Sequence, residues 1–416
     1  MGHASLLQLL QMAWYRTPRI LGRLRLPRAT DNLKTTRAAP MPVPDPFRQG
    51  LESGWITHDA SRLEHDLTLE ADVAVIGSGA GGATSAQMLS TAGFKVLLIE
   101  EGPLKTSSDF HLLENEAYAS LYQEGLGRMS KDGAITILQG RAVGGTTLVN
   151  WTSSFRTPPQ TLAHWAAAHN VTGLGEEQMR PWFERIEQEL GITPWALPPN
   201  ANNDVLRRGC EQLGYRWAVI PRNVRGCWNL GYCGMGCPVN AKQSMLVTRI
   251  PATLEQGGEL LYLARAERFE HNGERIQGLS CQALDSHGIH AIGRQVRVRA
   301  RHYILAGGGI NSPALLLRSD APDPHGRLGQ THLPAPGQLQ RSTLQRPYRP
   351  LLRRPTVHLQ RPLPMARRQR WPDWLQAGGA TAAPGPGHHA AGRAWPRECP
   401  AHGRAATYPR DAGAAA

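Results

Sequence analysis

Residues 71–103, ADVAVIGSGAGGATSAQMLSTAGFKVLLIEEGP, decide the fold of this chain. The apolar run Val73–Ile76 predicts a buried strand, because it is too short and too rich in β-branched residues for a helix. A helical stretch follows, and a second apolar run, Val96–Ile99, predicts a parallel partner strand. Strand, helix and strand in this order are typical of a nucleotide-binding βαβ unit.

Three glycines and an acid indicate what this unit binds. Gly77, Gly79 and Gly82 form GxGxxG directly after the first strand. The first permits a tight turn, the second lets backbone N–H groups approach a pyrophosphate at the helix N-terminus, and the third lets helix and strand pack closely. Glu100, which ends the second strand, is predicted to accept a hydrogen bond from a ribose hydroxyl. The motif alone does not separate NAD from FAD, and glycines before helices are also common as plain turn formers.

A second glycine-rich segment is Gly140–Asn150, GRAVGGTTLVN. The adjacent glycines Gly144 and Gly145 let the backbone run flat against a planar ligand. The polar side chains that could contact such a ligand are Thr146, Thr147 and Asn150. For Thr146 and Asn150, capping of the loop is the alternative role.

The third segment is Arg301–Ser319, RHYILAGGGINSPALLLRS. It predicts a strand running into Ala306–Gly309, then a turn capped by Asn311 or Ser312, then a helix that starts at Pro313. This arrangement places another helix N-terminus beside the nucleotide.

At these segments the chain resembles the glucose–methanol–choline (GMC) family of FAD-dependent oxidoreductases. VLLIEEGP matches the family's strand that ends in an acid, and GRAVGGTTLVN and GGINSPALLLRS match its two flavin-contacting segments in order and spacing. The resemblance covers about residues 70–329, with departures at Gly309 and Asp320, where Ala and Gly are usual. It implies an α/β fold with a Rossmann-like FAD-binding domain built on a parallel sheet, plus part of an α+β substrate domain.

The resemblance also implies FAD as cofactor and oxidation of an alcohol CH–OH group, with hydride transfer to flavin N5. The GxGxxG glycines would face the pyrophosphate, Glu100 the ribose, the 144–150 loop the isoalloxazine, and the backbone of Ala266 the adenine. The predicted cofactor-binding residues are Gly77, Gly79, Gly82, Glu100, Gly102, Arg141, Gly144, Gly145, Thr146, Thr147, Asn150, Ala266, Ala306, Gly307, Asn311 and Pro313.

We expect five segments along the chain. These are a basic extension and linker (1–69), the βαβ unit with the flavin loop (70–150), a mostly helical segment with a cysteine-rich loop (151–241), the remainder of the FAD-binding domain (242–329), and a tail (330–416).

The tail has an abnormal composition. Its 87 residues include 13 Arg and 13 Pro but no Lys, Ile or Phe, and Val357 is its only Val. Such a stretch cannot bury enough apolar area to offset chain entropy, so we expect disorder. One interpretation is a low-complexity extension that binds nucleic acid. The sharper hypothesis is translation out of frame: shifted by one nucleotide, THLPAPGQLQR can encode RTFLHPVNFSA, which resembles GMC sequence.

This hypothesis has a consequence for function. In the GMC family the catalytic His and its His or Asn partner lie in the C-terminal part, and no residue of this chain can be matched to them. We therefore predict no catalytic residue here and an inactive chain. The histidines of the tail are given no role; they are His332, His358, His388, His389 and His402.

The formal net charge of +13 does not indicate a nucleic-acid-binding body. The tail contributes +10 and residues 1–50 contribute +6, which leaves −3 for residues 51–329. The N-terminal segment is basic and partly amphipathic, with neither a secretory signal nor a transmembrane run. We expect a cytoplasmic protein whose partners are an alcohol and an unknown electron acceptor, with at most weak membrane-surface contact through the N-terminus.

Six cysteines without a secretory signal are typical of a reducing compartment. Cys227, Cys233 and Cys237 cluster in CWNLGYCGMGCP, a spacing that suggests a metal or iron–sulfur site, although a closed tetrahedral site needs a fourth ligand. Cys210 and Cys281 lie outside any recognised spacing. We favour the alternative, a packed glycine-rich loop with reduced thiols, and predict no metal ligand.

Two other functions stay open at this point. The first is an NAD(P)-linked reductase, which bound nicotinamide without flavin would support. The second is a non-functional frameshifted product, or a basic tail that binds nucleic acid with a strong salt dependence.

Overall fold

The computed structural model describes residues 43–330, 357–360 and 375–376. The chain divides into two units, 1–379 and 380–416, and every described residue belongs to the first. The N-terminal segment expected to touch a membrane surface lies outside the described residues. So does nearly all of the tail, with the hypotheses of disorder and frameshift that fall on it. Within the described part, no helix is long and apolar enough to cross a membrane.

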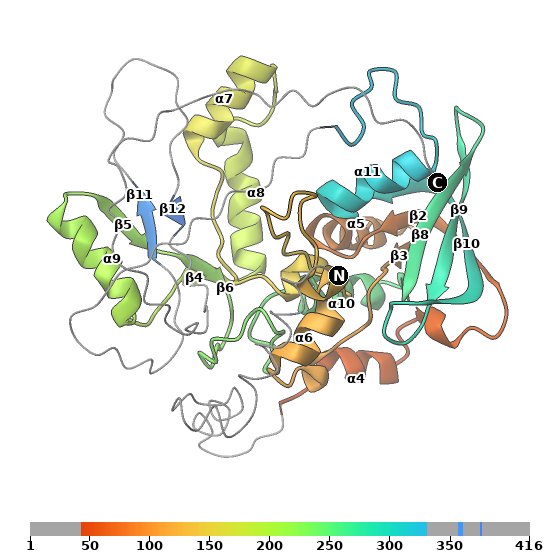
Figure 1. The fold of residues 1–416 in the computed structure, drawn as a ribbon, viewed down its shortest axis with the longest axis horizontal. Coiled ribbons are helices and arrows are strands. Elements are labelled where there is room, and N and C mark those ends of the chain that lie inside the picture. Colours follow the sequence, from red (N-terminus) through yellow and green to blue (C-terminus); the bar gives the residue numbers. More distant parts are fainter. Residues whose placement is uncertain (1–42, 331–356, 361–374, 377–416) are drawn as a thin grey trace. The chain divides into compact units, whose positions relative to one another are not determined.

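The predicted βαβ unit is present (Figure 1). Strand β2 (Leu67–Ile76) leads into helix α5 (Ala80–Thr91) and then into β3 (Val96–Ile99), which pairs parallel with β2. All four residues of β3 are buried, as are the last four of β2. Continuous burial of this kind is expected for strands covered on both faces of a sheet.

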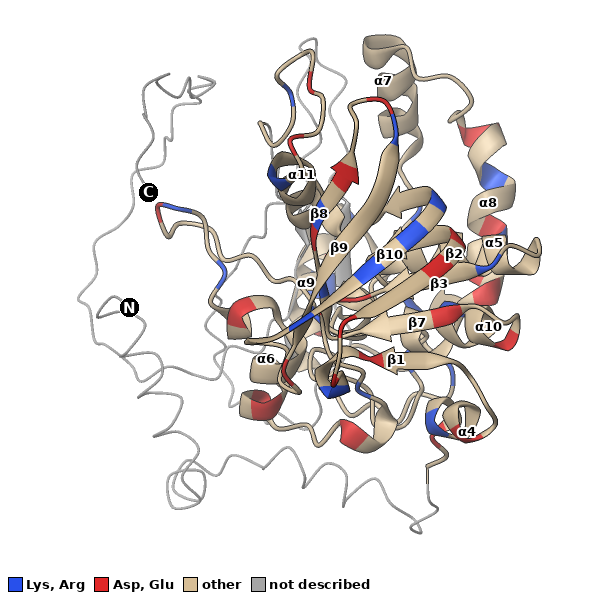
Figure 2. Cartoon of the chain, turned by 90° about the vertical axis from the view of Figure 1, so that its right-hand side faces the viewer, with Lys and Arg blue, Asp and Glu red and all other residues tan. Residues whose placement is uncertain are grey.

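These strands lie inside a seven-stranded sheet of order β1-β7-β3-β2-β10-β9-β8 (Figure 2). The strands not yet given are β1 (Thr57–Asp59), β7 (Glu259–Tyr262), β8 (Ala264–His271), β9 (Ile276–Leu284) and β10 (Ala291–Leu305). All pairs from β1 to β10 are parallel, and β10, β9 and β8 pair antiparallel. The expected hairpin turn at HNGERI joins β8 to β9. This mixed sheet confirms the predicted α/β fold with its parallel nucleotide-binding part.

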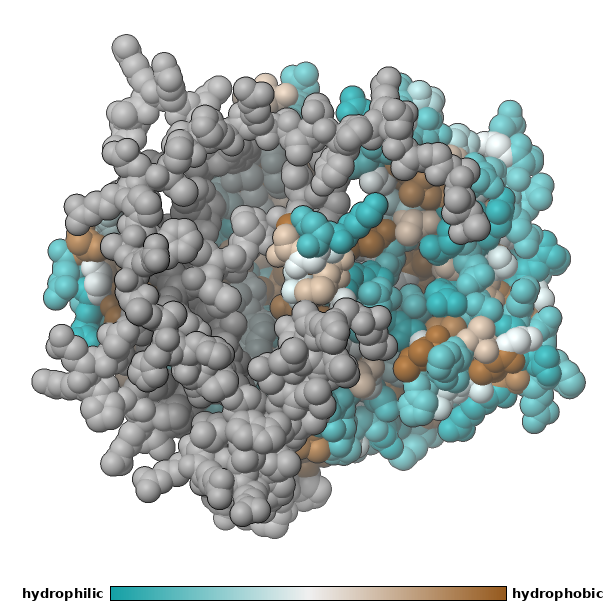
Figure 3. Space-filling view, viewed as in Figure 1, coloured by the Kyte–Doolittle hydropathy of each residue, from teal (hydrophilic) through white to brown (hydrophobic). Residues whose placement is uncertain are grey.

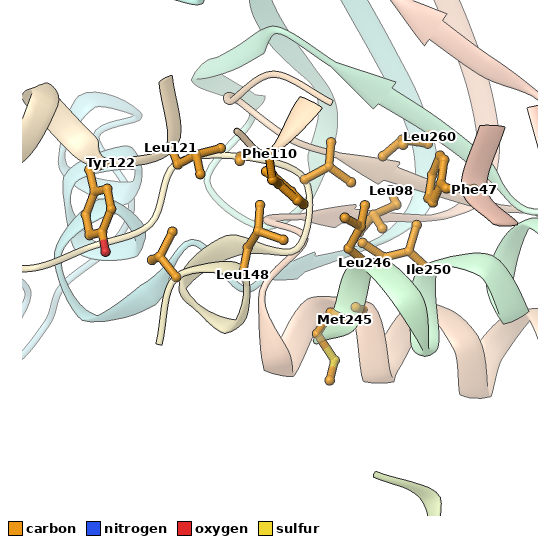
Figure 4. Packing of buried hydrophobic residues seen from close by; sticks show 14 of the residues in the cluster. Phe47, Leu98, Phe110, Leu121, Tyr122, Leu148, Met245, Leu246, Ile250 and Leu260 are labelled. Carbon is orange, nitrogen blue, oxygen red and sulfur yellow. The ribbon is translucent and has the colours of Figure 1, made fainter. Parts of the chain in front are cut away.

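Two apolar cores cover the two faces of the sheet. Alternate residues of β2 point to opposite faces, so Val73 and Val75 join one core while Ala74 and Ile76 join the other. The first core also takes side chains from α5, α4 (Pro46–Glu52) and α10 (Arg249–Glu255), and Figure 4 shows ten of its members labelled, among them Phe47, Leu98 and Ile250. The second core includes the hairpin strands and Leu315 of α11 (Gly308–Arg318).

The segment 151–241 contributes no strand to the large sheet. Its helices are α7 (Pro159–His169), α8 (Glu176–Glu189) and α9 (Ala201–Gln212). Its short strands are β4 (Ile192–Pro194), β5 (Arg216–Val219) and β6 (Pro221–Asn223). In the tail the structure describes β11 (Val357–Gln360), which pairs with β5, and β12 (Leu375–Gln376).

Other short elements complete the chain. They are α6 (Glu114–Leu121) and the 3-10 turns η1 (Ala60–Arg62), η2 (Ser107–Asp109), η3 (Gln123–Leu126), η4 (Gly145–Leu148) and η5 (Met245–Val247). On the described part of the face in Figure 3, apolar residues lie in small groups between hydrophilic ones.

Part of the expected N-terminal linker is folded. Asp45 caps α4 by accepting a hydrogen bond from the backbone N–H of Arg48, and Pro46 stands at the first helical position. Phe47 of this helix is only 3% exposed. Because β1 then joins the sheet beside β7, residues 46–59 are part of the nucleotide-binding unit.

The prediction that a helix starts at Pro313 is wrong. Helix α11 begins at Gly308, so neither Asn311 nor Ser312 caps it and Pro313 lies inside it. The strand β10 ends at Leu305, and the backbone N–H of Ala306 still donates to Ile76 O at 2.7 Å. Helix α11 begins directly after this strand. The prediction was wrong because it relied on the preference of proline for the first turn of a helix.

Candidate functional site

A cavity of about 680 Å³ lies where the central parallel strands end. Ile76, Ile99 and Leu305, the last residues of β2, β3 and β10, line it. Crevices at the carboxyl ends of parallel strands are where open α/β sheets bind ligands. Of the predicted site residues, eleven line this cavity: Gly77, Gly79, Glu100, Arg141, Gly145, Thr146, Thr147, Ala266, Ala306, Gly307 and Asn311.

The glycine turn between β2 and α5 is built for close approach. Gly77 has φ +103°, and a Cβ there would lie 2.5 Å from Ala306 O. A Cβ at Gly82 would lie 1.8 Å from Gly77 O, so this glycine serves the packing of helix against strand. At Gly79 nothing lies within 4 Å of such a Cβ. The space in front of Gly79 is therefore open cavity.

The N-terminus of α5 fits a phosphate group. Its N-cap residue is Gly79, and no side chain of the described residues caps it. The first backbone N–H groups of a helix lack intrahelical partners, and the helix dipole favours an anion there. Because Gly79 and Ala80 line the cavity, these donors are available to the pyrophosphate of a dinucleotide.

Glu100 is held by bonds that the sequence did not reveal. One carboxylate oxygen accepts from the Ser78 hydroxyl at 2.5 Å and from the Ser78 N–H at 3.1 Å, and the other accepts from Gly102 N–H at 2.9 Å. Only 8% of Glu100 is exposed, and burial raises the pKa of its carboxyl above the usual value. Oε2 accepts both Ser78 bonds and Oε1 accepts only one, so Oε1 keeps a lone pair to which a ribose hydroxyl could still donate.

Ser78 connects three parts of the cavity wall. Besides binding Glu100, its hydroxyl accepts from the backbone N–H of Gly144 at 2.9 Å. Its side chain is fully buried. The glycine turn, the end of β3 and the 144–147 loop are therefore fixed relative to one another by a single hydroxyl group.

The 144–147 loop packs closely against the glycine turn and against residues 245–246. A Cβ at Gly145 would lie 2.8 Å from the Cα of Gly79, and one at Gly144 would lie 3.3 Å from Leu246 N. Thr147 Oγ1 donates to Gly144 O at 2.6 Å and accepts from Met245 N–H at 3.0 Å. Close packing between neighbouring backbones thus accounts for both glycines.

Two polar side chains of this segment also cap the loop locally. Thr146 Oγ1 accepts from Gly140 N–H at 3.1 Å, and Asn150 Oδ1 accepts from Thr152 N–H at 3.2 Å. Thr146 lines the cavity and Asn150 does not. The loop-capping role considered for these residues is thus present in the structure.

Five predicted residues stand outside the cavity lining: Gly82, Gly102, Gly144, Asn150 and Pro313. Gly82, Gly102 and Gly144 support the wall from behind; a Cβ at Gly102 would lie 2.4 Å from the carbonyl carbon of Arg141. Pro313 lines a separate hollow between α11 and residues 321–330. The structure therefore brings most of the predicted cofactor-binding residues together at the cavity. The three glycines behind the wall allow close packing of the backbone instead.

The sequence reasoning missed several lining residues, of which Ser78, Glu101, Arg128, Gln139 and Ile289 matter most. Arg128 donates to Gln139 Oε1 at 2.9 Å and to Asn311 Oδ1 at 3.2 Å, which ties the 123–141 segment to α11. For Ser78 the signal was its place inside GxGxxG. For Glu101 it was its place directly after Glu100. For Arg128, Gln139 and Ile289 no local signal existed, because contacts between segments far apart in sequence bring them to the cavity.

The cysteine-rich loop adjoins the 145–148 turn. All five described cysteines are free, and among the described residues no group of three His, Cys, Asp or Glu could hold a metal ion. Arg222 donates to Cys233 Sγ at 3.2 Å. Lys242, which is 2% exposed, donates to Leu148 O at 2.8 Å and to Cys233 O at 2.9 Å, and burial lowers its pKa to about 8. Lys242 thereby fastens the cysteine-rich loop to the 145–148 turn.

Comparisons with known proteins agree with this site. The GMC oxidoreductase family model matches residues 118–334, and the FAD binding domain model matches residues 72–111. This chain belongs to the GMC oxidoreductase family, and its cofactor is FAD. The predicted family and cofactor are confirmed, and the nicotinamide alternative is set aside.

Several relatives match well over half of this chain. Long-chain-alcohol oxidase FAO4B of Arabidopsis thaliana is 32% identical over 264 residues, which are 62% of this chain and 35% of that protein. A GMC-type oxidoreductase of Sinorhizobium fredii, y4nJ, is 33% identical over 62% of this chain and 50% of its own length. The crystal structure of pyridoxine 4-oxidase from Mesorbium loti overlaps with a TM-score of 0.45 at 19% identity, over 60% of this chain and 52% of that one. The chain spans between about a third and three fifths of the length of the curated relatives it matches.

Proposed function

We propose that this chain carries the FAD-binding part of an oxidoreductase that acts on the CH–OH group of alcohols. The observation that carries the proposal is that all three glycine-rich segments line the same cavity at the strand ends. Its volume is within the range of small-molecule sites. The names of the long-chain-alcohol oxidases among the relatives favour an alcohol as the substrate.

The chain's own residues have distinct roles in this proposal. The N-terminus of α5 with Gly79 would bind the pyrophosphate, and Glu100 would bind the adenosine ribose. The backbone of Ala266 would contact the adenine ring. Residues 144–147, held by Ser78 and Met245, position the flavin ring. When bound, FAD supplies a hydride acceptor at N5. The protein's contribution is to orient that group.

We further propose that residues 330–416 are an out-of-frame sequence and that the chain lacks the histidine needed to take the proton of the alcohol. The composition of the tail supports this, since it lacks Lys, Ile and Phe. Sequencing the gene across the codons for Gly326–Thr331 tests it. The inactivity follows from the same hypothesis, and dye reduction by flavin-loaded protein with any alcohol would disprove it.

Gly79→Ala tests the proposed cofactor site. The backbone at Gly79, φ −69° and ψ −168°, accepts any residue, and the new Cβ meets only the cavity. We expect unchanged thermal unfolding without cofactor and FAD binding at least about tenfold weaker, because the methyl group keeps the pyrophosphate from the helix N-terminus. Fluorescence titration with FAD measures the change.

Gly209→Ala in α9 is the matched control, since its Cβ also meets nothing within 4 Å but lies outside the cavity lining. It should bind FAD like the wild type. Equal FAD affinity of the Gly79 and Gly209 variants would refute the proposed site.

A further inference from the structure

One end of the cavity is formed by the turn between β9 and β10, residues 285–290. We propose that Ile289 of this turn caps the adenine of FAD and that Arg141 is the positioning residue that holds the turn in place. The inference rests on the proposed placement of FAD and adds residues that select the nucleotide end of the cofactor.

The turn has a defined conformation. The backbone N–H of Asp285 donates to His290 O at 2.7 Å, and Gly288 N–H donates to Asp285 O at 2.7 Å. The side chain of Asp285 accepts from Ile289 N–H at 2.8 Å. These bonds fix the direction in which the backbone presents Ile289.

Arg141 ties this turn to the nucleotide-binding strands. Its Nε donates to Glu101 Oε1 at 3.1 Å, and its terminal nitrogen donates to Gly288 O. Its side chain is only 12% exposed. Because Glu101 directly follows Glu100, one guanidinium group joins the ribose-binding end of β3 to the turn.

The same end of the cavity contains the strand start predicted to contact adenine. A Cβ at Gly288 would lie 3.1 Å from Leu263 Cδ2, and Leu263 directly precedes Ala264 of β8. Ala264 N–H donates to Glu100 O at 3.1 Å. Ala264, Ala266 and Ile289 all line the cavity, so the turn and this strand border one space.

Ile289 is the apolar residue of the turn, and 58% of it is exposed. An isoleucine held at a cavity mouth can cover the apolar face of a planar ring. This contact lowers the free energy of binding, because it removes the isoleucine side chain from water. A phosphate would not give this gain, and it has uncapped helix N-termini at the cavity instead, those of α5 and α11. The apolar side chain of Ile289 therefore favours the adenine ring, rather than a phosphate group, at this end of the cavity.

Ile289→Ser tests the cap, with Ile276→Ser as the control. Ile276 is also exposed on the hairpin, at 37%, but does not line the cavity. Calorimetric titration of the full chain with ADP and with FAD is the measurement. Partial loss of isoleucine burial predicts about tenfold weaker binding of both ligands to the Ile289 variant and no change for the Ile276 variant.

Arg141→Ala tests the positioning role. We expect it to weaken ADP binding about tenfold as well, and the double variant with Ile289→Ser to be no weaker than Arg141→Ala alone, because the cap is already misplaced. Additive losses would overturn the positioning role.

Two outcomes separate this inference from the proposed function. If the wild type binds ADP and FAD and the Ile289 variant binds them equally well, the cap is refuted while the proposed site stands. If the wild type binds neither ligand, the proposed site is refuted and the cap with it. Matching far-UV circular dichroism of both serine variants establishes that folding is unchanged.

Discussion

The two walls of the cavity differ in how they are built. One wall consists of strand ends and the glycine turn, where β2, β3 and β10 hold each other by regular backbone pairing. The other wall consists of residues 123–147, which have no long element and depend on side-chain bonds such as those of Arg128 and Thr147. The conformation of the regular wall therefore follows from residues close together in sequence. The conformation of the irregular wall depends on hydrogen bonds to residues far away in sequence.

The greatest loss of stability should follow a substitution in the regular wall. Gly82→Ala places a methyl group 1.8 Å from Gly77 O, and backbone cannot move aside without separating α5 from β2. We expect a loss of more than about 4 kcal/mol in unfolding free energy, measured by urea denaturation.

Its control is Gly81→Ala, one position earlier in the same helix. Nothing lies within 4 Å of a Cβ there, and Gly81 is exposed. Replacement should stabilise the helix by about 0.5–1 kcal/mol. Equal stability of the two variants would show that the close helix–strand contact is not needed.

An intermediate effect is expected next to the irregular wall, where Lys242 fastens the cysteine-rich loop to the 145–148 turn. Burial disfavours its charged form, so between pH about 8 and 10.5 the folded protein binds fewer protons than the unfolded chain. The contribution of Lys242 to stability therefore rises with pH across this window, by up to about 3 kcal/mol. Thermal unfolding from pH 7 to 10 should show this rise in the wild type and a smaller one in Lys242→Met.

Other groups that face Lys242 affect the same window. Arg222 disfavours its charge, and ionised Cys233 or Cys237 would favour it. These groups remain in the methionine variant, so the difference between the two profiles isolates Lys242. Lys131→Met, at an exposed position, should reproduce the wild-type profile; if Lys242→Met does so too, the buried lysine is not the source.

The smallest effect tests the link between the two walls. Ser78→Ala leaves the Glu100 carboxylate and the Gly144 N–H without their hydroxyl partner in a buried place. We expect a loss of about 2 kcal/mol. Denaturant unfolding measures it.

Ser90 offers the opposite case. It is 3% exposed, and its hydroxyl has no hydrogen-bond partner among the described residues. Ser90→Ala should therefore leave stability unchanged within about 0.5 kcal/mol or raise it. A similar loss in both variants would mean that volume, not hydrogen bonding, explains the effect of Ser78→Ala.

The sequence predicted the regular part well because its signals are local. Four apolar residues before GxGxxG indicated where β2 ends, and Val96–Ile99 indicated β3. The position of the 144–147 loop followed from its motif, but its bonds to Ser78 and Met245 did not, because they span 66 and 98 residues. The predicted start of α11 was too late in the sequence, because it relied on the position of Pro313. The strand in fact ends with the hydrogen bond from Ala306 N–H to Ile76 O, a contact that no local pattern shows.

The order of strands in the large sheet bears on how the chain is made. Strand β10, which ends at Leu305, lies between β2 and β9, so β2 keeps one edge unpaired until about 200 further residues have followed β3. At usual rates of translation this takes roughly ten to forty seconds. Until then the edge of β2 that pairs with β10 has no partner strand. Productive folding of this domain is thus a late, non-local event, and chaperones that shield strand edges should raise its yield.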